Sequence, residues 1–239
     1  MRVLAVDTST SVTAVAVTEG VRVLAEDGAP SDARHGSVIL PRIQAVLAGA
    51  SLQLADIDLL AVGVGPGSFT GLRVGLATIK GLAFALAKPV RGVSSLEAIA
   101  CAALERAPQA AVLIDAFKSE VYAGVFGRAA DGEVEQRMAL FHASPAEAAA
   151  RVLQWLEAGA AIACGDGIRR YETEILPALG ADARVMLAEP LLDVPRGALV
   201  ARLALRDFVR LGPSDLATLE PAYVRGSDAK LPERPLAVE

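Results

Sequence analysis

Residues 3–17 read VLAVDTSTSVTAVAV, two apolar runs joined by a polar turn that begins at Asp7. Small and β-branched residues in short runs predict two neighbouring strands, over 2–8 and 12–18. The pattern returns about a hundred residues later, where AVLID at 111–115 precedes VYAGVF at 121–126. LAVGVGPG at 60–67 is likewise echoed by AIACGDG at 161–167. This internal duplication predicts an α/β fold of two related lobes with a cleft between them.

The rest of the chain alternates apolar strands with helical spacing. Further strands are expected over 21–26, 59–64 and 90–93, and helices over 33–48, 70–86 and 94–106. Ser94 followed by Glu97 fits a capping box at the start of the last of these helices. We assign residues 1–100 to the first lobe and 101–205 to the second. Residues 206–239 are expected to pack back on the first.

Composition excludes several classes of protein. Of 239 residues, 53% are hydrophobic, which excludes a disordered chain. The 23 basic and 28 acidic residues give a net charge of −5, which argues against a protein that grips nucleic acid or an anionic membrane alone. No run is long and uncharged enough to be a signal or a membrane span, so we expect no membrane contact and a cytoplasmic location. Cys101 and Cys164 indicate buried thiols in a reducing compartment.

The sequence shows no clear set of residues for metal binding or for nucleophilic catalysis. The two histidines, His35 and His142, are more than a hundred residues apart, and no C-x-x-C or H-x-x-x-H pair exists. Gly67-Ser68-Phe69 resembles a nucleophile elbow only superficially, because an elbow serine needs a histidine base. A peptidase is therefore the weakest of the functions considered.

A nucleotide cleft has some support in the sequence. Asp7 and Asp115 end matched strands, and turns that follow apolar strands can present backbone N–H groups to a phosphate. The candidate residues are Asp7, Ser9, Asp115, Gly165 and Gly167. The alternative is that these residues only make the turn hydrogen bonds that Asp, Ser and Gly favour. Both interpretations stay open.

The densest feature is the turn GPGSFTGLR at 65–73, which we call the signature turn. Its residues of interest are Gly65, Pro66, Gly67, Ser68, Phe69, Thr70, Gly71 and Arg73. The glycines permit close approach, and Ser68 or Thr70 can cap the following helix. That helix carries Gly71 with Gly75, and Ala77 with Gly81, each four residues apart. Since glycine inside a helix costs about 1 kcal/mol, the pattern indicates close packing against the core or a partner.

Together these segments resemble the TsaB (YeaZ) family, the non-catalytic partner in bacterial threonylcarbamoyladenosine synthesis on tRNA. The likeness rests on VLAVDTSTSVTAVAV, RHGSVILPRIQAVL, the signature turn with its helix, GVSSLEAIA, and PAYVR near the end. It implies the actin-like, sugar-kinase-like ATPase fold. The catalytic sister TsaD carries a segment of the form GVNHLEGH, whose two histidines bind metal. The corresponding positions here are Ser95 and Ile99, so the resemblance implies no metal, no catalysis and no required cofactor.

The resemblance also implies partners: TsaD as a heterodimer, a TsaE-type ATPase, and tRNA only through the complex. Without TsaD we expect a homodimer, since an exposed apolar helix face seeks cover. The expected interface lies on helices near 33–48 and 70–86: His35, Leu40, Ile43, Leu47, Leu72, Gly75, Leu76, Ile79 and Ala83. The rival hypothesis is an ATP-binding kinase or ATPase of the same fold, which Asp7, Ser9 and Asp115 would serve.

Overall fold

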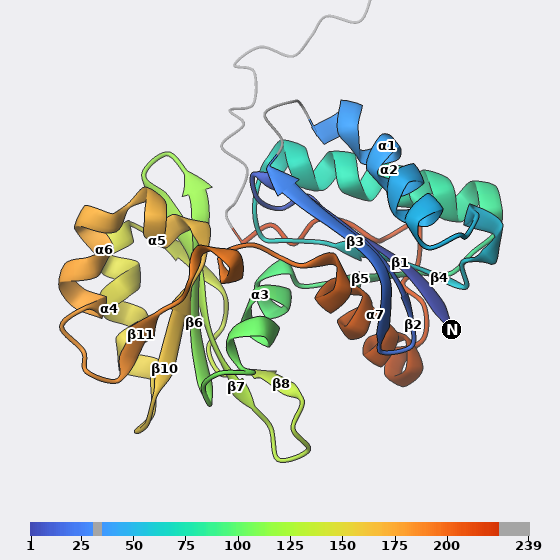
Figure 1. The fold of residues 1–239 in the computed structure, drawn as a ribbon. Coiled ribbons are helices and arrows are strands. Elements are labelled where there is room, and N and C mark those ends of the chain that lie inside the picture. Colours follow the sequence, from blue (N-terminus) through green and yellow to red (C-terminus); the bar gives the residue numbers. More distant parts are fainter. Residues whose placement is uncertain (31–34, 225–239) are drawn as a thin grey trace, which may run out of the picture.

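The computed structural model describes residues 1–30 and 35–224. Two mixed sheets form two lobes that lie side by side (Figure 1). The first sheet contains β1 (Arg2–Asp7), β2 (Val12–Glu19), β3 (Arg22–Pro30), β4 (Leu59–Gly63) and β5 (Val90–Val93), in the order β3-β2-β1-β4-β5. The pairs β1–β2 and β2–β3 are antiparallel, whereas β4 is parallel to both β1 and β5.

The second sheet repeats this arrangement. It contains β6 (Gln109–Phe117), β7 (Glu120–Arg128), β8 (Val134–Gln136), β10 (Ala161–Cys164) and β11 (Val185–Leu187), in the order β11-β10-β6-β7-β8. The strand β9 (Phe141–Ala143) is an addition that pairs with β7. As β4 lies beside β1, β10 lies parallel to β6. The predicted duplication is therefore confirmed at the level of sheet topology.

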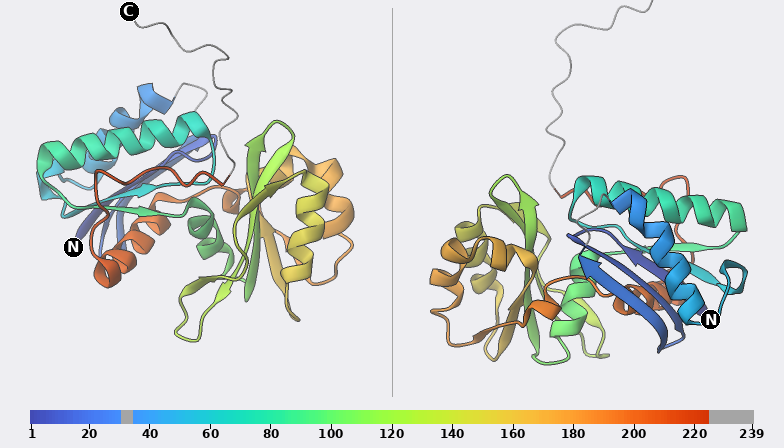
Figure 2. Two further views of the ribbon diagram at one scale, coloured as in Figure 1. Left: turned by 180° about the vertical axis from the view of Figure 1, so that it is seen from behind. Right: turned by 45° about the horizontal axis from the view of Figure 1, so that its top comes forward.

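Helices cover both faces of each sheet (Figures 1 and 2). On the first sheet, α1 (His35–Gly49) and α2 (Phe69–Leu86) cover one face and α7 (Gly197–Leu211) covers the other. On the second sheet, α4 (Pro145–Trp155), α5 (Asp166–Arg170) and α6 (Glu172–Leu179) lie on one face and α3 (Ser95–Ala103) on the other. The short 3-10 helices Leu54–Asp56 and Pro190–Leu192 complete the elements. Helices α3 and α7 pack against each other between the sheets.

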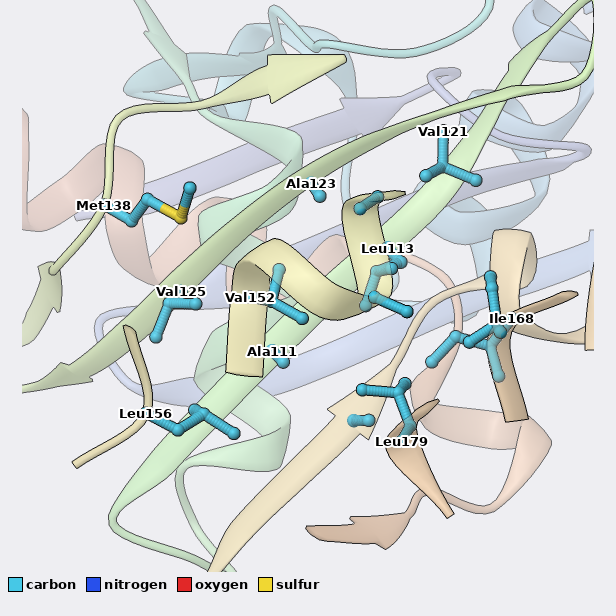
Figure 3. Packing of buried hydrophobic residues seen from close by; sticks show 14 of the residues in the cluster. Ala111, Leu113, Val121, Ala123, Val125, Met138, Val152, Leu156, Ile168 and Leu179 are labelled. Carbon is cyan, nitrogen blue, oxygen red and sulfur yellow. The ribbon is translucent and has the colours of Figure 1, made fainter. Parts of the chain in front are cut away.

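Burial on both faces explains why the central strands are apolar throughout. In β1, Leu4 and Val6 face α1 and α2, while Val3 and Ala5 face α7. In β6, Ala111 and Leu113 point toward α4 and α6, where they pack with Val152, Ile168 and Leu179 (Figure 3). Alternate side chains of one strand therefore belong to different core clusters.

Helix boundaries agree closely with the expectations. Three other features of the helices differ from what the sequence predicts. The long α2 has no single counterpart in the second lobe, where α5 and α6 divide the same place after β10. The Ser94 hydroxyl caps α3 by accepting from the Glu97 N–H at 3.3 Å, but the Glu97 carboxylate pairs with Arg206 at 2.8 Å instead of closing a capping box. The expected boundary at residues 205 and 206 falls inside α7, where Ala204 before it and Phe208 after it pack in the same core cluster as Val3 and Ala5 of β1.

Helix α2 is apolar and long enough to cross a membrane by length and composition alone. Its apolarity has a structural origin, because Leu76, Ile79 and Ala83 pack into the core over the first sheet. The segment after α7 crosses back over the same lobe: the Ser214 N–H donates to the Val90 carbonyl at 2.8 Å, and the Ala222 N–H to that of Val64 at 2.8 Å.

Candidate functional site

The signature turn docks directly on the turn between β1 and β2. The Ser68 N–H donates to the Ser9 carbonyl at 2.7 Å, and the Thr8 hydroxyl donates to the Gly71 carbonyl at 2.7 Å. A Cβ added at Gly67 would lie 2.3 Å from the Ser9 carbonyl oxygen. The Ser68 hydroxyl caps α2, as expected, by accepting from the Gly71 N–H at 3.2 Å. Gly67 is thus required by the contact between two turns of the same lobe, whereas a Cβ at Gly65 would lie 2.7 Å from Leu72 Cδ1.

Asp7 is enclosed beneath these turns. Its side chain accepts from the Ser9 N–H at 2.8 Å, the Ser9 hydroxyl at 2.6 Å and the Ser95 hydroxyl at 2.7 Å. Asp7 is 1% exposed, and a Cβ added at Gly63 would lie 1.8 Å from its Oδ2. The expectation that Asp7 faces the cleft is therefore wrong, because protein donors surround its carboxylate.

Gly165 and Gly167 form the equivalent turn of the second lobe. A Cβ at Gly165 would lie 2.1 Å from the Leu113 carbonyl oxygen, and one at Gly167 would lie 2.8 Å from the carbonyl carbon of Ile114. The Gly165 N–H donates to Asp193 Oδ1 at 2.9 Å. These glycines pack against strand β6, so the structure accounts for them without a bound ligand.

A cavity of about 460 Å³ does open between the lobes. Hydroxyl groups from the first lobe line one side, and charged side chains with one aromatic ring line the other: Ser9, Thr10, Ser11 and Ser68, then Asp115, Phe117, Asp166, Arg169 and Arg170. Of the predicted cleft residues, Ser9 and Asp115 line this cavity.

The charged side chains of the cavity are already bound to other groups of the second lobe. Asp115 accepts from the Phe117 N–H at 2.9 Å and the Tyr171 hydroxyl at 3.0 Å, and its Oδ2 lies 3.2 Å from Arg170 Nε. Asp166 Oδ1 accepts from the Asp115 N–H at 2.9 Å. Burial raises the pKa of Asp166 to about 6, with the nearby carboxylates of Asp115 and Asp193 adding to the effect. Arg169 Nε lies 2.9 Å from Asp193 Oδ2, so both guanidinium groups of the cavity are already paired with carboxylates.

The fold implies a magnesium nucleotide in this cleft, but the residues present do not fit one. Magnesium needs carboxylate oxygens that are open to solvent and phosphate. The Asp7 oxygens are bound by Ser9 and Ser95, and Asp115 is bound by a backbone N–H, a hydroxyl and an arginine. Among the residues that the structure describes, no group of three or more His, Cys, Asp or Glu side chains could hold a metal ion. The two positions that the resemblance singled out as degenerate ligand positions are also interior: Ser95 is bonded to Asp7, and Ile99 of α3 packs in the core.

The expected partner interface needs correction. Seven of its residues are buried in the first lobe, so they cannot contact a partner: Ile43, Leu47, Leu72, Gly75, Leu76, Ile79 and Ala83. A Cβ at Gly75 would lie 2.2 Å from Thr8 Oγ1, which shows that this glycine serves intramolecular packing. Leu40 is 49% exposed. His35 begins α1, and its side chain lies outside the described part of the structure.

The opposite sides of α1 and α2 form a different surface, which we call the outer helix face. The two helices lie side by side over the first sheet (Figures 1 and 2). Their outward residues are exposed, uncharged and mostly small: Leu40, Pro41, Gln44, Ala45 and Ala48 on α1, and Thr70, Ala77, Gly81, Phe84 and Ala85 on α2. The Phe84 ring is 85% exposed, and a Cβ at Gly81 would meet no atom within 4 Å in the part of the chain that the structure describes.

Charged groups of α2 are turned to its sides or its end. The Lys80 Nζ donates to the Leu219 carbonyl at 3.1 Å and the Lys88 Nζ to the Ala55 carbonyl at 3.1 Å. The Arg73 guanidinium lies 3.7 Å from the centre of the Phe69 ring, and its Nε donates to the Tyr223 hydroxyl at 3.2 Å. Phe69 and Tyr223 are each about half exposed. Exposed aromatics and an ordered arginine at one end of an uncharged face are typical of protein contacts.

Several of these residues carry weak sequence signals. Thr8 and Asp193 act through contacts with residues far along the chain, which no local pattern reveals. Phe117, Lys118 and Ser119 have φ values of 61°, 53° and 59°, an unusual left-handed run for residues other than glycine or asparagine. By contrast, the sequence does show that Ala77 and Gly81 are four residues apart and so share one side of the helix. It does not show that this side faces outward.

Comparison with known proteins places these features in a family. The sequence model described as "TsaD: tRNA N6-adenosine threonylcarbamoyltransferase" matches residues 29–157. The chain is 31% identical over 243 residues to the tRNA threonylcarbamoyladenosine biosynthesis protein TsaB of Escherichia coli (strain K12), covering 97% of this chain and 99% of that protein. The solved structure of YeaZ from Pseudomonas aeruginosa matches with a TM-score of 0.79 at 29% identity, over 93% of this chain and 99% of that one.

A more distant likeness bears on the fold alone. The (R)-2-hydroxyglutaryl-CoA dehydratase component A of Acidaminococcus fermentans matches with a TM-score of 0.52 at 10% identity, over 87% of this chain and 99% of that one. Together with the duplicated sheets, these likenesses confirm the predicted α/β fold of two related lobes.

Proposed function

Because this chain belongs to the TsaB (YeaZ) family, we propose that it is a non-catalytic subunit of the machinery that makes threonylcarbamoyladenosine on tRNA. The curated relative is named for that biosynthesis, and the matching family model is named for the transferase. In this proposal a TsaD-type paralogue carries the transfer chemistry and a TsaE-type ATPase supplies nucleotide turnover. The chain meets tRNA only within the assembled complex, in keeping with its net charge of −5.

The outer helix face is the observation that carries the proposal. It joins two helices into an uncharged surface, with Phe84 projecting and Gly81 leaving room for a close neighbour. A mid-helix glycine costs about 1 kcal/mol relative to alanine, and among the described residues no atom lies within 4 Å of a Cβ placed at Gly81, so no packing there offsets that cost. A partner helix that approaches the backbone at Gly81 would offset it. The paralogue, which is homologous to this chain, can offer a similar pair of helices.

The same face accounts for the expected self-association. An uncovered apolar surface tends to bind a second copy when the preferred partner is absent. The homodimer and the heterodimer would then use the same surface, so adding the paralogue should dissociate the homodimer.

Substitution of Phe84 by alanine tests the interface. The ring is 85% exposed, so Phe84→Ala should leave the free energy of unfolding nearly unchanged but weaken binding to the TsaD-type paralogue tenfold or more. Calorimetric titration of the purified paralogue measures the affinity. Val209→Ala is the matched control, because Val209 is 76% exposed on α7, over the other face of the sheet. Equal affinities for both variants and the unaltered chain would contradict the interface.

A further inference from the structure

The Ser95 hydroxyl joins three segments of the first lobe. It donates to Asp7 Oδ2 at 2.7 Å and accepts from the Gly65 N–H at 3.1 Å. The Ser95 N–H in turn donates to the Gly65 carbonyl at 2.9 Å. Ser95 is fully buried, and it connects the end of β1, the signature turn and the first turn of α3.

The second lobe contains an equivalent connection. Gly165 occupies the place after β10 that Gly65 occupies after β4, and both have positive φ, at 119° and 96°. The Gly165 N–H is bound by the Asp193 carboxylate, which comes from the segment before α7 just as Ser95 comes from the start of α3. In each lobe, a buried side chain that follows the last strand therefore holds the glycine turn. The recurrence indicates a structural device rather than an accident of one turn.

We infer that Asp7 and Ser95 form a buried anchor that fixes the signature turn to β1, and that this use of Asp7 leaves the described part of the first lobe with no carboxylate that lines the cavity and could bind a magnesium nucleotide. Three protein donors already bind the Asp7 oxygens, and Gly63 lies where no side chain could fit. Coordination to magnesium would require Asp7 to give up these bonds and its enclosure. The inference goes beyond the proposed function and does not depend on the partner.

A double-mutant cycle tests the anchor. Ser95→Ala removes the donor to Asp7 and the acceptor of the Gly65 N–H, and should lower Tm by about 5 °C. Amide exchange at Gly65 should become about tenfold faster or more. Asp7→Asn keeps the side-chain shape, and the double variant should lose less stability than the sum of the two single losses. If Ser95→Ala fails to fold, Ser95→Cys retains a weak donor and should give an intermediate loss.

Ser94→Ala is the matched control. Its hydroxyl caps α3 at the Glu97 N–H but makes no bond to Asp7 or Gly65, so exchange at Gly65 should stay as in the unaltered chain. Equal exchange at Gly65 in Ser94→Ala and Ser95→Ala, or full additivity in the cycle, would overturn the anchor.

Nucleotide titration tests the second half of the inference. Calorimetry with ADP and ATP up to millimolar concentration, with and without magnesium, should show no magnesium-dependent binding to the unaltered chain. Magnesium-dependent binding that Asp7→Asn abolishes would overturn the assignment of Asp7 as an anchor. Because no partner is present, failure here is distinguishable from failure of the proposed interface.

Discussion

Gly75 and Gly81 lie on the same helix, yet the structure predicts that leucine at these positions has opposite effects. A Cβ at Gly75 would lie 2.2 Å from Thr8 Oγ1, the atom that donates to the Gly71 carbonyl. Overpacking costs about 1–3 kcal/mol, and loss of the buried hydrogen bond costs about 1–3 kcal/mol more. After the gain of about 0.8 kcal/mol in helix propensity, Gly75→Leu should destabilise the fold by about 3 kcal/mol. That is a large share of a typical free energy of unfolding.

Gly81→Leu should instead stabilise the isolated chain by about 0.8 kcal/mol, since a side chain there enters open space. Urea unfolding followed by circular dichroism measures both variants. Gly81→Leu should also weaken binding to the paralogue, because leucine fills the gap that a partner helix would enter. A stable, well-folded Gly75→Leu chain would refute the packing argument. A Gly81→Leu chain that is stable and binds as tightly as the unaltered protein would refute the placement of the interface.

Three further predictions concern buried polar and ionisable groups. The pKa of Asp166 in the folded chain is raised to about 6, so the unfolded chain loses this proton at a lower pH than the folded chain does. The free energy of unfolding should therefore fall as pH rises from about 4 to 6. Asp166→Asn should flatten that fall in pH-dependent urea unfolding, and an unchanged profile would contradict the prediction. Burial raises the pKa of the Cys101 thiol to about 12 and raises that of Cys164, so the native chain should resist a disulfide reagent at pH 8, and rapid labelling would disprove it. Arg206 binds Glu97 and Asp207 at 2.8 and 2.7 Å, and the Arg206 and Glu97 side chains are only 16% and 20% exposed. Arg206→Met should therefore cost about 2 kcal/mol by leaving the partly buried Glu97 carboxylate without its cation, whereas Arg2→Met, which loses an exposed pair with Glu19, should cost little in the same urea assay.

The strands and helices were readable because the first lobe follows local rules. Apolar runs such as 59–63 become strands covered on both faces, and Ser68 and Ser94 begin helices by capping them. The duplication was visible because the turns at Gly65 and Gly165 recur after equivalent strands. These features depend on neighbours in sequence, which the chain itself displays.

Which side of α2 is buried and which is exposed could not be predicted from the sequence in the same way. Both of its sides carry small or apolar residues, so composition alone does not distinguish two glycines with different surroundings. A Cβ at Gly75 would meet Thr8, whereas one at Gly81 would meet no atom of the described residues within 4 Å. Similarly, an aspartate at a strand end suggests a cleft ligand, but only the fold reveals that Ser95 reaches Asp7 across 88 residues of sequence. Such long-range contacts decided which predicted site residues became structural ones.

The most direct test of the proposed role is an omission assay of tRNA modification. The TsaD-type transferase, the TsaE-type ATPase, threonylcarbamoyl-adenylate and unmodified tRNA are combined with the unaltered chain, with Phe84→Ala, or with neither. We expect multiple-turnover formation of threonylcarbamoyladenosine with the unaltered chain, much less with Phe84→Ala, and almost none when the chain is left out. Modification that proceeds equally well without the chain would contradict its assignment as a required subunit.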